Sequence, residues 1–363
     1  MPLRLEARGE PSPAMRFATP FVAAALTFVS GFVLFAALGK NPLEGIRVFF
    51  VSPLKDAYGV AELLLKASPL MLIAVGLAVG FRANVWNIGA EGQFIAGAVA
   101  GGGIALAFDA SASPLLLPAM IVAGAIGGAL WASIPAILRI RFNANEILVS
   151  LMLVYIAQLG VSWLVHGPWK DPQGFNFPQT KMFADAALLP TLVEGTRLNA
   201  VLVLALAAVI GAYVFMQRSF TGYQMRVAGE SDTAARYAGY STRRTMWAGM
   251  LAGGTMAGIA GVAEVAGPMG QLTEHVSSNY GFAAIIVAFV GRLNPIGILF
   301  ASLLMALLYL GGEQAQQYLN LPSSIAKVFQ GMLLLFLLGA DVLVSYRVRW
   351  YEVSRGRSSN PAS

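Results

Sequence analysis

The sequence predicts an all-α polytopic membrane protein with about ten transmembrane helices. Of its 363 residues, 57% are hydrophobic and only 12% are charged, which is roughly half the charged fraction of a typical soluble domain. Apolar runs near or above about 18 residues recur along the chain, and a helix of that length crosses the hydrocarbon core of a bilayer. The chain has no cysteine, which excludes disulfides, thiolate metal sites and cysteine catalysis.

The apolar runs define the expected spans. The first, 17–38, follows a polar segment, 1–16, which we expect to be a flexible cytoplasmic tail; the run is too long for a signal-peptide core and so predicts an uncleaved anchor. The run 280–291 is short, and we expect residues before Tyr280 to extend it. A second cytoplasmic tail, 347–363, leaves 17–346 as the membrane domain. The remaining spans are expected at 63–81, 88–108, 114–138, 147–165, 198–216, 247–263, 296–312 and 325–344.

The distribution of basic residues orients these spans. If the N-terminus is cytoplasmic and there are about ten spans, the inner segments hold sixteen of the 24 Lys and Arg residues, and the outer segments hold the other eight. Because cytoplasmic loops of membrane proteins carry an excess of Lys and Arg, this ratio predicts that both termini are cytoplasmic. An odd number of spans would place the arginines of the C-terminal tail outside.

A polar cytoplasmic stretch, 217–245, lies between two expected spans and contains a short helix with marked ends. Ser231 is a suitable N-cap residue, and Gly239 lies where a C-cap glycine would. The small residues between the caps are expected to share one face that can approach another surface closely: Ala234, Ala235 and Ala238. We therefore interpret this helix as a docking element.

A second polar stretch joins the second and third expected spans and carries Asn84, Asn87, Glu91 and Gln93. A carboxylate inside a membrane should face protein or water rather than lipid. One interpretation is that this bend borders a polar translocation path. The other is that the polar side chains brace a broken helix by bonding free backbone groups. The sequence leaves both open.

Polar residues near other span ends and the glycine spacing lead to further expectations. Glu146, with Asn143 and Asn145, is expected to cap the start of the fifth span. Glu264 is expected in a water-exposed loop, with an outer gate as the alternative. Glycines four residues apart let helices touch backbone to backbone, and we expect them to pack helices within one subunit: Gly124 and Gly128, Gly249 and Gly253, and Gly254 and Gly258.

The sequence contains no recognised catalytic motif. It lacks a phosphate-binding P-loop, a His-Glu-x-x-His zinc motif and a Gly-x-Ser-x-Gly elbow. Its two histidines, His166 and His275, do not predict a metal site, and the spread of basic residues over loops does not predict nucleic-acid binding. We therefore predict a non-enzymatic, cofactor-free pore subunit that another protein powers. The rival interpretations are an ion-coupled secondary transporter and a membrane scaffold.

Three motifs in order resemble one transporter family. They are Asn87-Ile-Gly-Ala-Glu-Gly-Gln, a cytoplasmic segment that includes Ala228-Gly-Glu-Ser and Ala234-Ala-Arg-Tyr-Ala-Gly, and Tyr280-Gly-Phe followed by Gly-Arg-Leu-Asn-Pro. Together, over about 63–312, they resemble permease subunits of bacterial ABC importers in the branched-chain amino acid and ribose permease family. The Trp-Asn-Ile-Gly-Ala-Glu-Gly-Gln form is most similar to the longer permease of nucleoside importers. Val85-Trp86 departs from the family, where a phenylalanine before the asparagine is more usual.

The resemblance implies the ABC importer permease fold in a bacterial plasma membrane. The implied partners are a cytoplasmic ABC ATPase, a second and shorter permease in a heterodimer, and a periplasmic or lipoprotein solute-binding protein. The implied solute is a nucleoside or a related small polar molecule, with a simple sugar as the alternative. By analogy, the ATPase contact comprises Gly229, Glu230, Ser231, Ala234, Ala235, Ala238 and Gly239, and the translocation path lies near Asn84, Asn87, Glu91 and Gln93.

Overall fold

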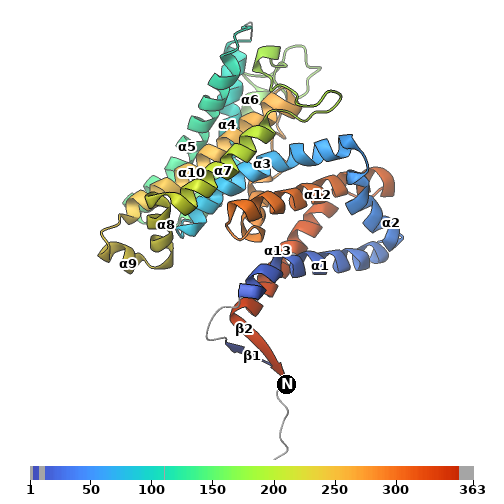
Figure 1. Ribbon diagram of the computed structural model, residues 1–363. Helices are drawn as coiled ribbons and strands as arrows, with labels where there is room; N and C mark the ends of the chain where they lie inside the picture. Colours follow the sequence, from blue (N-terminus) through green and yellow to red (C-terminus); the bar gives the residue numbers. More distant parts are fainter. Residues whose placement is uncertain (1–2, 8–12, 110, 351–363) are drawn as a thin grey trace, which may run out of the picture. The chain divides into compact units, whose positions relative to one another are not determined.

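The fold is described by a computed structural model for residues 3–7, 13–109 and 111–350 (Figure 1). Within these residues nine helices are long and apolar enough to cross a membrane, and a tenth apolar helix is shorter. The prediction of an all-helical polytopic protein with about ten spans is confirmed. The chain forms two compact units: one holds the chain up to Ile46 and from Lys327 onward, and the other runs from Arg47 to Ala326.

The longer helices follow the expected order. They are α1 (Pro13–Ala37), α3 (Ala57–Arg82), α4 (Ala90–Ala107), α5 (Leu116–Phe142), α6 (Glu146–His166), α7 (Val201–Arg218), α10 (Thr242–Glu264), α12 (Pro295–Leu319) and α13 (Ile325–Ser345). The shorter helices are α2 (Pro42–Ile46), α8 (Phe220–Glu230), α9 (Asp232–Tyr237) and α11 (Tyr280–Val290). Short π and 3-10 turns lie between α2 and α3, before α7 and after α10.

The first unit joins the two ends of the chain. Strand β1 (Leu3–Ala7) pairs antiparallel with β2 (Tyr346–Trp350), so that Leu3 lies opposite Trp350. The rings of Phe35 in α1 and Phe329 in α13 lie 5.9 Å apart. The expectation of a flexible N-terminal tail is therefore wrong for residues 3–7, which form a ribbon with 346–350, and α1 begins before residue 17. Residues 351–363 of the expected C-terminal tail lie outside the described part of the chain.

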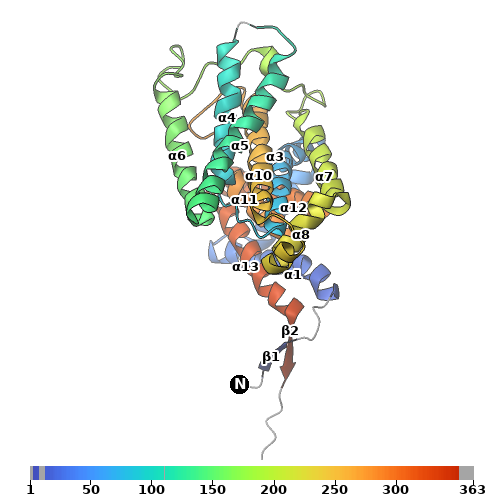
Figure 2. The ribbon, with the colours of Figure 1, turned by 90° about the vertical axis from the view of Figure 1, so that its left-hand side faces the viewer.

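In the second unit, α10 is the central helix and packs against α3, α4 and α5, which run beside it (Figure 2). Glycines make these contacts close: a side chain at Gly258 would overlap the carbonyl oxygen of Gly124, and one at Gly128 would overlap that of Gly254. Such backbone-to-backbone packing is typical of membrane helices. The expectation that these glycines pack helices within the subunit is confirmed.

Helix α11 is only 11 residues long, or about 16 Å, roughly half of a hydrocarbon core about 30 Å thick. The expected helical extension before Tyr280 is wrong, because residues 271–279 are not helical. Gly270 and Asn279 have positive φ angles of 66° and 64°, and a right-handed helix cannot continue through that conformation. Arg292, with φ of 58°, ends α11 at its other side. The unit therefore contains a half-length membrane helix.

Candidate functional site

The docking stretch forms two helices rather than one, α8 and α9, and we call residues 219–241 the coupling segment. The Ser231 hydroxyl oxygen accepts a hydrogen bond from the Ala234 N–H at 3.2 Å, which confirms its N-cap role. At the other end Gly239 has φ of 76°, and the Tyr240 N–H donates to the Ala235 carbonyl at 2.9 Å. This pattern is a Schellman C-cap, so the cap prediction at Gly239 is confirmed as well.

The three alanines of α9 and its C-cap do not share one face, which corrects the sequence prediction. Ala235 is fully buried, whereas Ala234 and Ala238 are exposed. Neighbouring residues on a helix point about 100° apart, so Ala234 and Ala235 cannot face the same surface. Tyr237 is 91% exposed beside the two outward alanines. The surface that α9 presents therefore comprises Ala234, Ala238 and Tyr237, while Ala235 packs inward.

The coupling segment lies directly on the C-terminal end of α3. A side chain at Gly229 would overlap the carbonyl oxygen of Arg82 and meet Ala83. Close backbone contact of this kind leaves little room for α8 to move without displacing the end of α3. Glu230 is exposed and pairs with Arg226 at 3.1 Å within α8, and the Thr242 hydroxyl donates to Asp232 at 2.9 Å, tying α9 to the start of α10.

The polar bend between α3 and α4 begins where α8 touches it. Asn84 is exposed, adopts φ of 57°, and accepts a hydrogen bond from the Trp86 indole N–H at 2.8 Å. Asn87 and Gln93 exchange two amide hydrogen bonds, of 2.8 and 2.9 Å, and each is 1% exposed. Asn87 also accepts from the Gly89 N–H at 3.1 Å. The Asn87–Gln93 pair therefore holds the bend to the first turn of α4.

Glu91 caps the half-length helix α11. Its carboxylate, 1% exposed, accepts a hydrogen bond from the Gly281 N–H at 2.7 Å, in the first turn of α11. A side chain at Gly281 would overlap the backbone of Glu91, so α4 and α11 touch at this point. A carboxylate at a helix N-terminus satisfies unpaired N–H groups and complements the helix dipole. All four path candidates thus make internal bonds, and the bonds of the three buried ones, Asn87, Glu91 and Gln93, support the bracing interpretation for them.

The structure corrects the sequence predictions for the two carboxylates at other span ends, Glu146 and Glu264. Asn145 caps α6 by accepting from the Ile147 and Leu148 N–H groups, while Glu146 pairs with Arg139 at 3.3 Å. The cap is therefore formed by Asn145 rather than Glu146. Glu264 is the last residue of α10, and the helical stretch continues to Met269. The expectation of a loop carboxylate in water is wrong.

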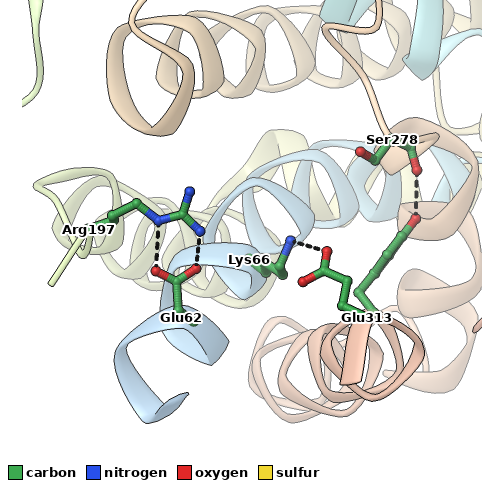
Figure 3. Close-up of polar contacts among 6 residues, drawn as sticks. Glu62, Lys66, Arg197, Ser278 and Glu313 are labelled. Atoms are coloured by element: carbon green, nitrogen blue, oxygen red, sulfur yellow. Dashed lines mark hydrogen bonds and ion pairs between the residues drawn. The ribbon is translucent and has the colours of Figure 1, made fainter. Parts of the chain in front are cut away.

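The sequence analysis singled out Glu264 but did not connect it with a group of charged residues at the far end of α3. We call Glu62, Lys66, Arg197, Glu264 and Glu313 the charged cluster; Figure 3 labels all of them except Glu264. Arg197 donates two hydrogen bonds to Glu62, at 2.9 and 2.6 Å, and Lys66 donates to Glu313 at 2.9 Å. The hydrogen bonds to Glu62 raise the pKa of the Arg197 guanidinium above its usual range. The signal that could have found the cluster is a Glu and a Lys four residues apart in an otherwise apolar helix.

Comparison with known proteins assigns the family. Residues 59–338 match the branched-chain amino acid transport system permease component family. The chain belongs to this family. It is 35% identical to the glucose ABC transporter permease of Haloferax volcanii, over 95% of this chain and 93% of the relative.

Two relatives occur in one organism, Lactococcus lactis. The chain is 30% identical to the nucleoside ABC transporter permease NupB, over 88% of this chain and 89% of the relative. It is 27% identical to the nucleoside permease NupC, over 74% of this chain and 87% of the relative. The protein is thus a multi-pass membrane permease component of an ABC transport system, a non-catalytic subunit.

Proposed function

We propose that the protein is the pore subunit of an ATP-driven importer for a nucleoside or a related small polar solute. The observation that carries this proposal is the family membership of the chain. In addition, its coupling segment presents a short, capped helix with an exposed surface. A small-faced helix that docks into a groove on a partner is a common mode of recognition. A cytoplasmic ABC ATPase is the proposed partner at this helix, with contacts from Gly229, Glu230, Ser231, Ala234, Ala238 and Gly239; Ala235 acts by packing α9 in place.

A simple sugar is the second candidate solute. The relative at 35% identity is a glucose permease, and the match covers more of both chains than the NupB match does. Fold and family alone do not identify a solute. A thermal-shift assay of the partner solute-binding protein with nucleosides and sugars separates the two candidates.

The contacts support a route for the proposed coupling. A push on α9 reaches α8, and α8 touches Arg82 and Ala83 through Gly229. From there the bend leads to the Asn87–Gln93 pair and then to Glu91, which holds α11. We propose that closure of the ATPase pair moves this series of contacts and switches which side of the membrane the path opens to. Asn84, Asn87, Glu91 and Gln93 act in this proposal as the joint beside the path.

We propose that both termini are cytoplasmic and that the membrane is the plasma membrane. The antiparallel pairing of β1 with β2 supports the first part, because paired strands must lie on the same side of a membrane. The basic residues favour the cytoplasmic side. We further propose a second, shorter permease as the heterodimer partner and a periplasmic or lipoprotein solute-binding protein; the two nucleoside permeases of Lactococcus lactis support a paired arrangement.

Reconstitution of the complete complex in vesicles tests the proposal. We expect uptake of adenosine or glucose that requires ATP and the binding protein, and that persists when the proton and sodium gradients are dissipated. Uptake that stops when those gradients collapse at constant ATP would establish a secondary transporter instead. Failure of the chain to co-purify with an ATPase would leave the scaffold interpretation.

A further inference from the structure

Two phenylalanines stand outside the membrane-spanning helices, in the loop that follows α6. Phe175 is 93% exposed and Phe177 is 64% exposed, and they lie between the end of α6 at His166 and the start of α7 at Val201. Grouped apolar side chains that the protein itself does not cover mark a surface for another protein or for a membrane. We call residues 174–177 the phenylalanine tip.

Hydrogen bonds close the backbone of this loop. The Asp171 N–H donates to the Gln179 carbonyl oxygen at 2.8 Å and so joins the two sides of the loop. The Phe177 N–H donates to the Gly174 carbonyl oxygen at 2.9 Å, which makes a turn of the tip itself. The tip is therefore a defined turn that carries both phenylalanines.

Phe175 adopts a backbone conformation that bulky residues rarely take. Its φ is 47°, and that of Asn176 is 67°. The Lys170 ammonium group donates a hydrogen bond to the Asn176 side-chain oxygen. A positive φ is unfavourable for residues other than glycine, and it persists where surrounding contacts impose it, most often at functional sites. The contacts around the tip thus hold Phe175 outward.

The base of the loop lies at the end of the neighbouring membrane-spanning helices. A side chain at Gly103 would lie 3.1 Å from the Trp169 ring, and α4 ends four residues later at Ala107, which is about 6 Å along the helix. In α6, Trp163 is 67% exposed and belongs to the last turn. Because tryptophans concentrate where a membrane meets water, these two residues mark that boundary.

The length of the loop limits the distance between the tip and this boundary. Phe175 is four residues from each partner of the closing hydrogen bond, Asp171 and Gln179, and four residues extend at most about 14 Å. The polar layer on each side of the hydrocarbon core is about 5–8 Å thick. The phenylalanine tip is therefore within reach of that layer.

The tip also continues a surface that faces lipid. Helix α6 packs against α4 and α5, and its opposite face is exposed and apolar along its length, including Met152, Ile156, Leu159 and Trp163. Figure 2 shows α6 at the edge of the second unit, with the loop at its end. An exposed apolar face on a membrane-spanning helix lies against lipid, so the surface that adjoins the tip is the bilayer.

We infer that the phenylalanine tip is a membrane anchor, in which the side chains of Phe175 and Phe177 insert between headgroups and acyl chains beside α6. Apolar rings gain free energy when they leave water, and this boundary region accepts phenylalanine. In the proposed topology the lipid belongs to the outer leaflet, because α7 connects this loop to the coupling segment on the opposite face. The inference goes beyond the proposed transport function and does not depend on it.

Spin labels at single cysteines test the depth of the tip, since the chain has no native cysteine. Phe175→Cys and Phe177→Cys report on the tip, and Gln173→Cys, at an exposed position beside it, keeps both phenylalanines. Leu159→Cys on α6 is the lipid control, and Glu194→Cys on an exposed stretch before α7 is the water control. Collision rates with oxygen, which enters lipid, and with a water-soluble nickel chelate are measured for the complete complex in vesicles of phosphatidylethanolamine and phosphatidylglycerol.

We expect the ratio of oxygen to nickel collisions at positions 175 and 177 to be several-fold higher than at 194 and below that at 159. Adding Phe175→Ser and Phe177→Ser to Gln173→Cys should shift the ratio at 173 toward the value at 194. Ratios at 173, 175 and 177 equal to that at 194 would overturn the inference.

The solute-binding protein is the other candidate occupant of this surface. A tip that nickel reaches until the solute-binding protein is added, and that is shielded only then, would overturn the membrane anchor in favour of a protein contact. Either contrary result leaves the transport function standing if ATP-dependent uptake is retained. A lipid-embedded tip in a complex without such uptake would support the anchor and overturn the transport function alone.

Discussion

Replacing Glu91 separates the two interpretations of the polar bend. In the structure its carboxylate is buried and accepts the Gly281 N–H at 2.7 Å at the start of α11. Hydrogen bonds to charged groups contribute about 1.5–3 kcal/mol, and a charge at a helix terminus adds about 0.3–1 kcal/mol. Glu91→Ala removes both and should lower the free energy of unfolding by about 2–4 kcal/mol. Glu91→Gln keeps an acceptor oxygen and should cost about 1 kcal/mol.

The assay is thermal unfolding of the detergent-purified permease followed by uptake in vesicles. A loss of about 1 kcal/mol corresponds to a fall in Tm of about 2–4 °C for chains somewhat shorter than this one, so Glu91→Ala should melt several degrees below wild type and Glu91→Gln slightly below it. Glu194→Gln, on an exposed loop, is the matched control and should leave Tm unchanged. Uptake per folded molecule of Glu91→Gln should stay near the wild-type value.

The opposite pattern would refute the bracing argument. If Glu91→Gln melts with wild-type Tm and yet loses uptake, the carboxylate contributes through its charge to the path and not through its bond to α11. The same result would favour the interpretation that Asn87 and Gln93 border the translocation path, since they occupy the same turn of the bend.

Three further predictions follow from burial and packing. Ala235→Asp should lower Tm by several degrees because it buries a charge. Ala234→Asp should leave Tm unchanged and lower ATP-driven uptake, and equal losses of Tm in the two variants would contradict the assigned faces of α9. Gly258→Val should lower the free energy of unfolding by about 1–3 kcal/mol or more, because it overpacks α5 against α10. The control Gly160→Val, on an open face of α6, should leave that free energy unchanged. Unchanged Tm for both variants would mean that the close contact is not required. Fluorescent reporters fused to either terminus should both be protected from external quencher in whole cells, and protection of only one would contradict the strand pairing.

Local signals made much of this structure predictable. Apolar length located the spans, and the caps at Ser231 and Gly239 could be identified because a cap depends on residues within four positions of itself. The faces of α9 could not be assigned from small size alone, because packing against α8 and α10 decides which alanine turns inward. The end of α11 at Tyr280 was missed for a similar reason: its first N–H groups are capped by Glu91, which lies 190 residues earlier in the chain.

The charged cluster shows why the sequence alone does not reveal groups of residues that are distant along the chain. Glu62 and Arg197 are separated by 135 residues and Lys66 and Glu313 by 247, so no local pattern connects them. Lys66 alone looks like a lysine that extends to the membrane surface, and Glu62 looks like a residue just outside a span. Only the fold brings their partners to the same turn of α3.

Helix α3 contacts both regions that the proposed mechanism connects, the coupling segment and the charged cluster. Its residues from Ala67 to Phe81 are all buried, so the helix is surrounded by protein and cannot shift without its neighbours. One end meets the coupling segment through Gly229, and the other carries Lys66 and Glu62, about 24 Å and about 30 Å from Arg82 at about 1.5 Å per residue. A displacement at Arg82 must therefore appear at the charged cluster unless the helix bends at Pro69, where a backbone hydrogen bond is missing. Because the same helix contacts both regions, the proposed mechanism needs no second element to connect the coupling segment with the charged cluster.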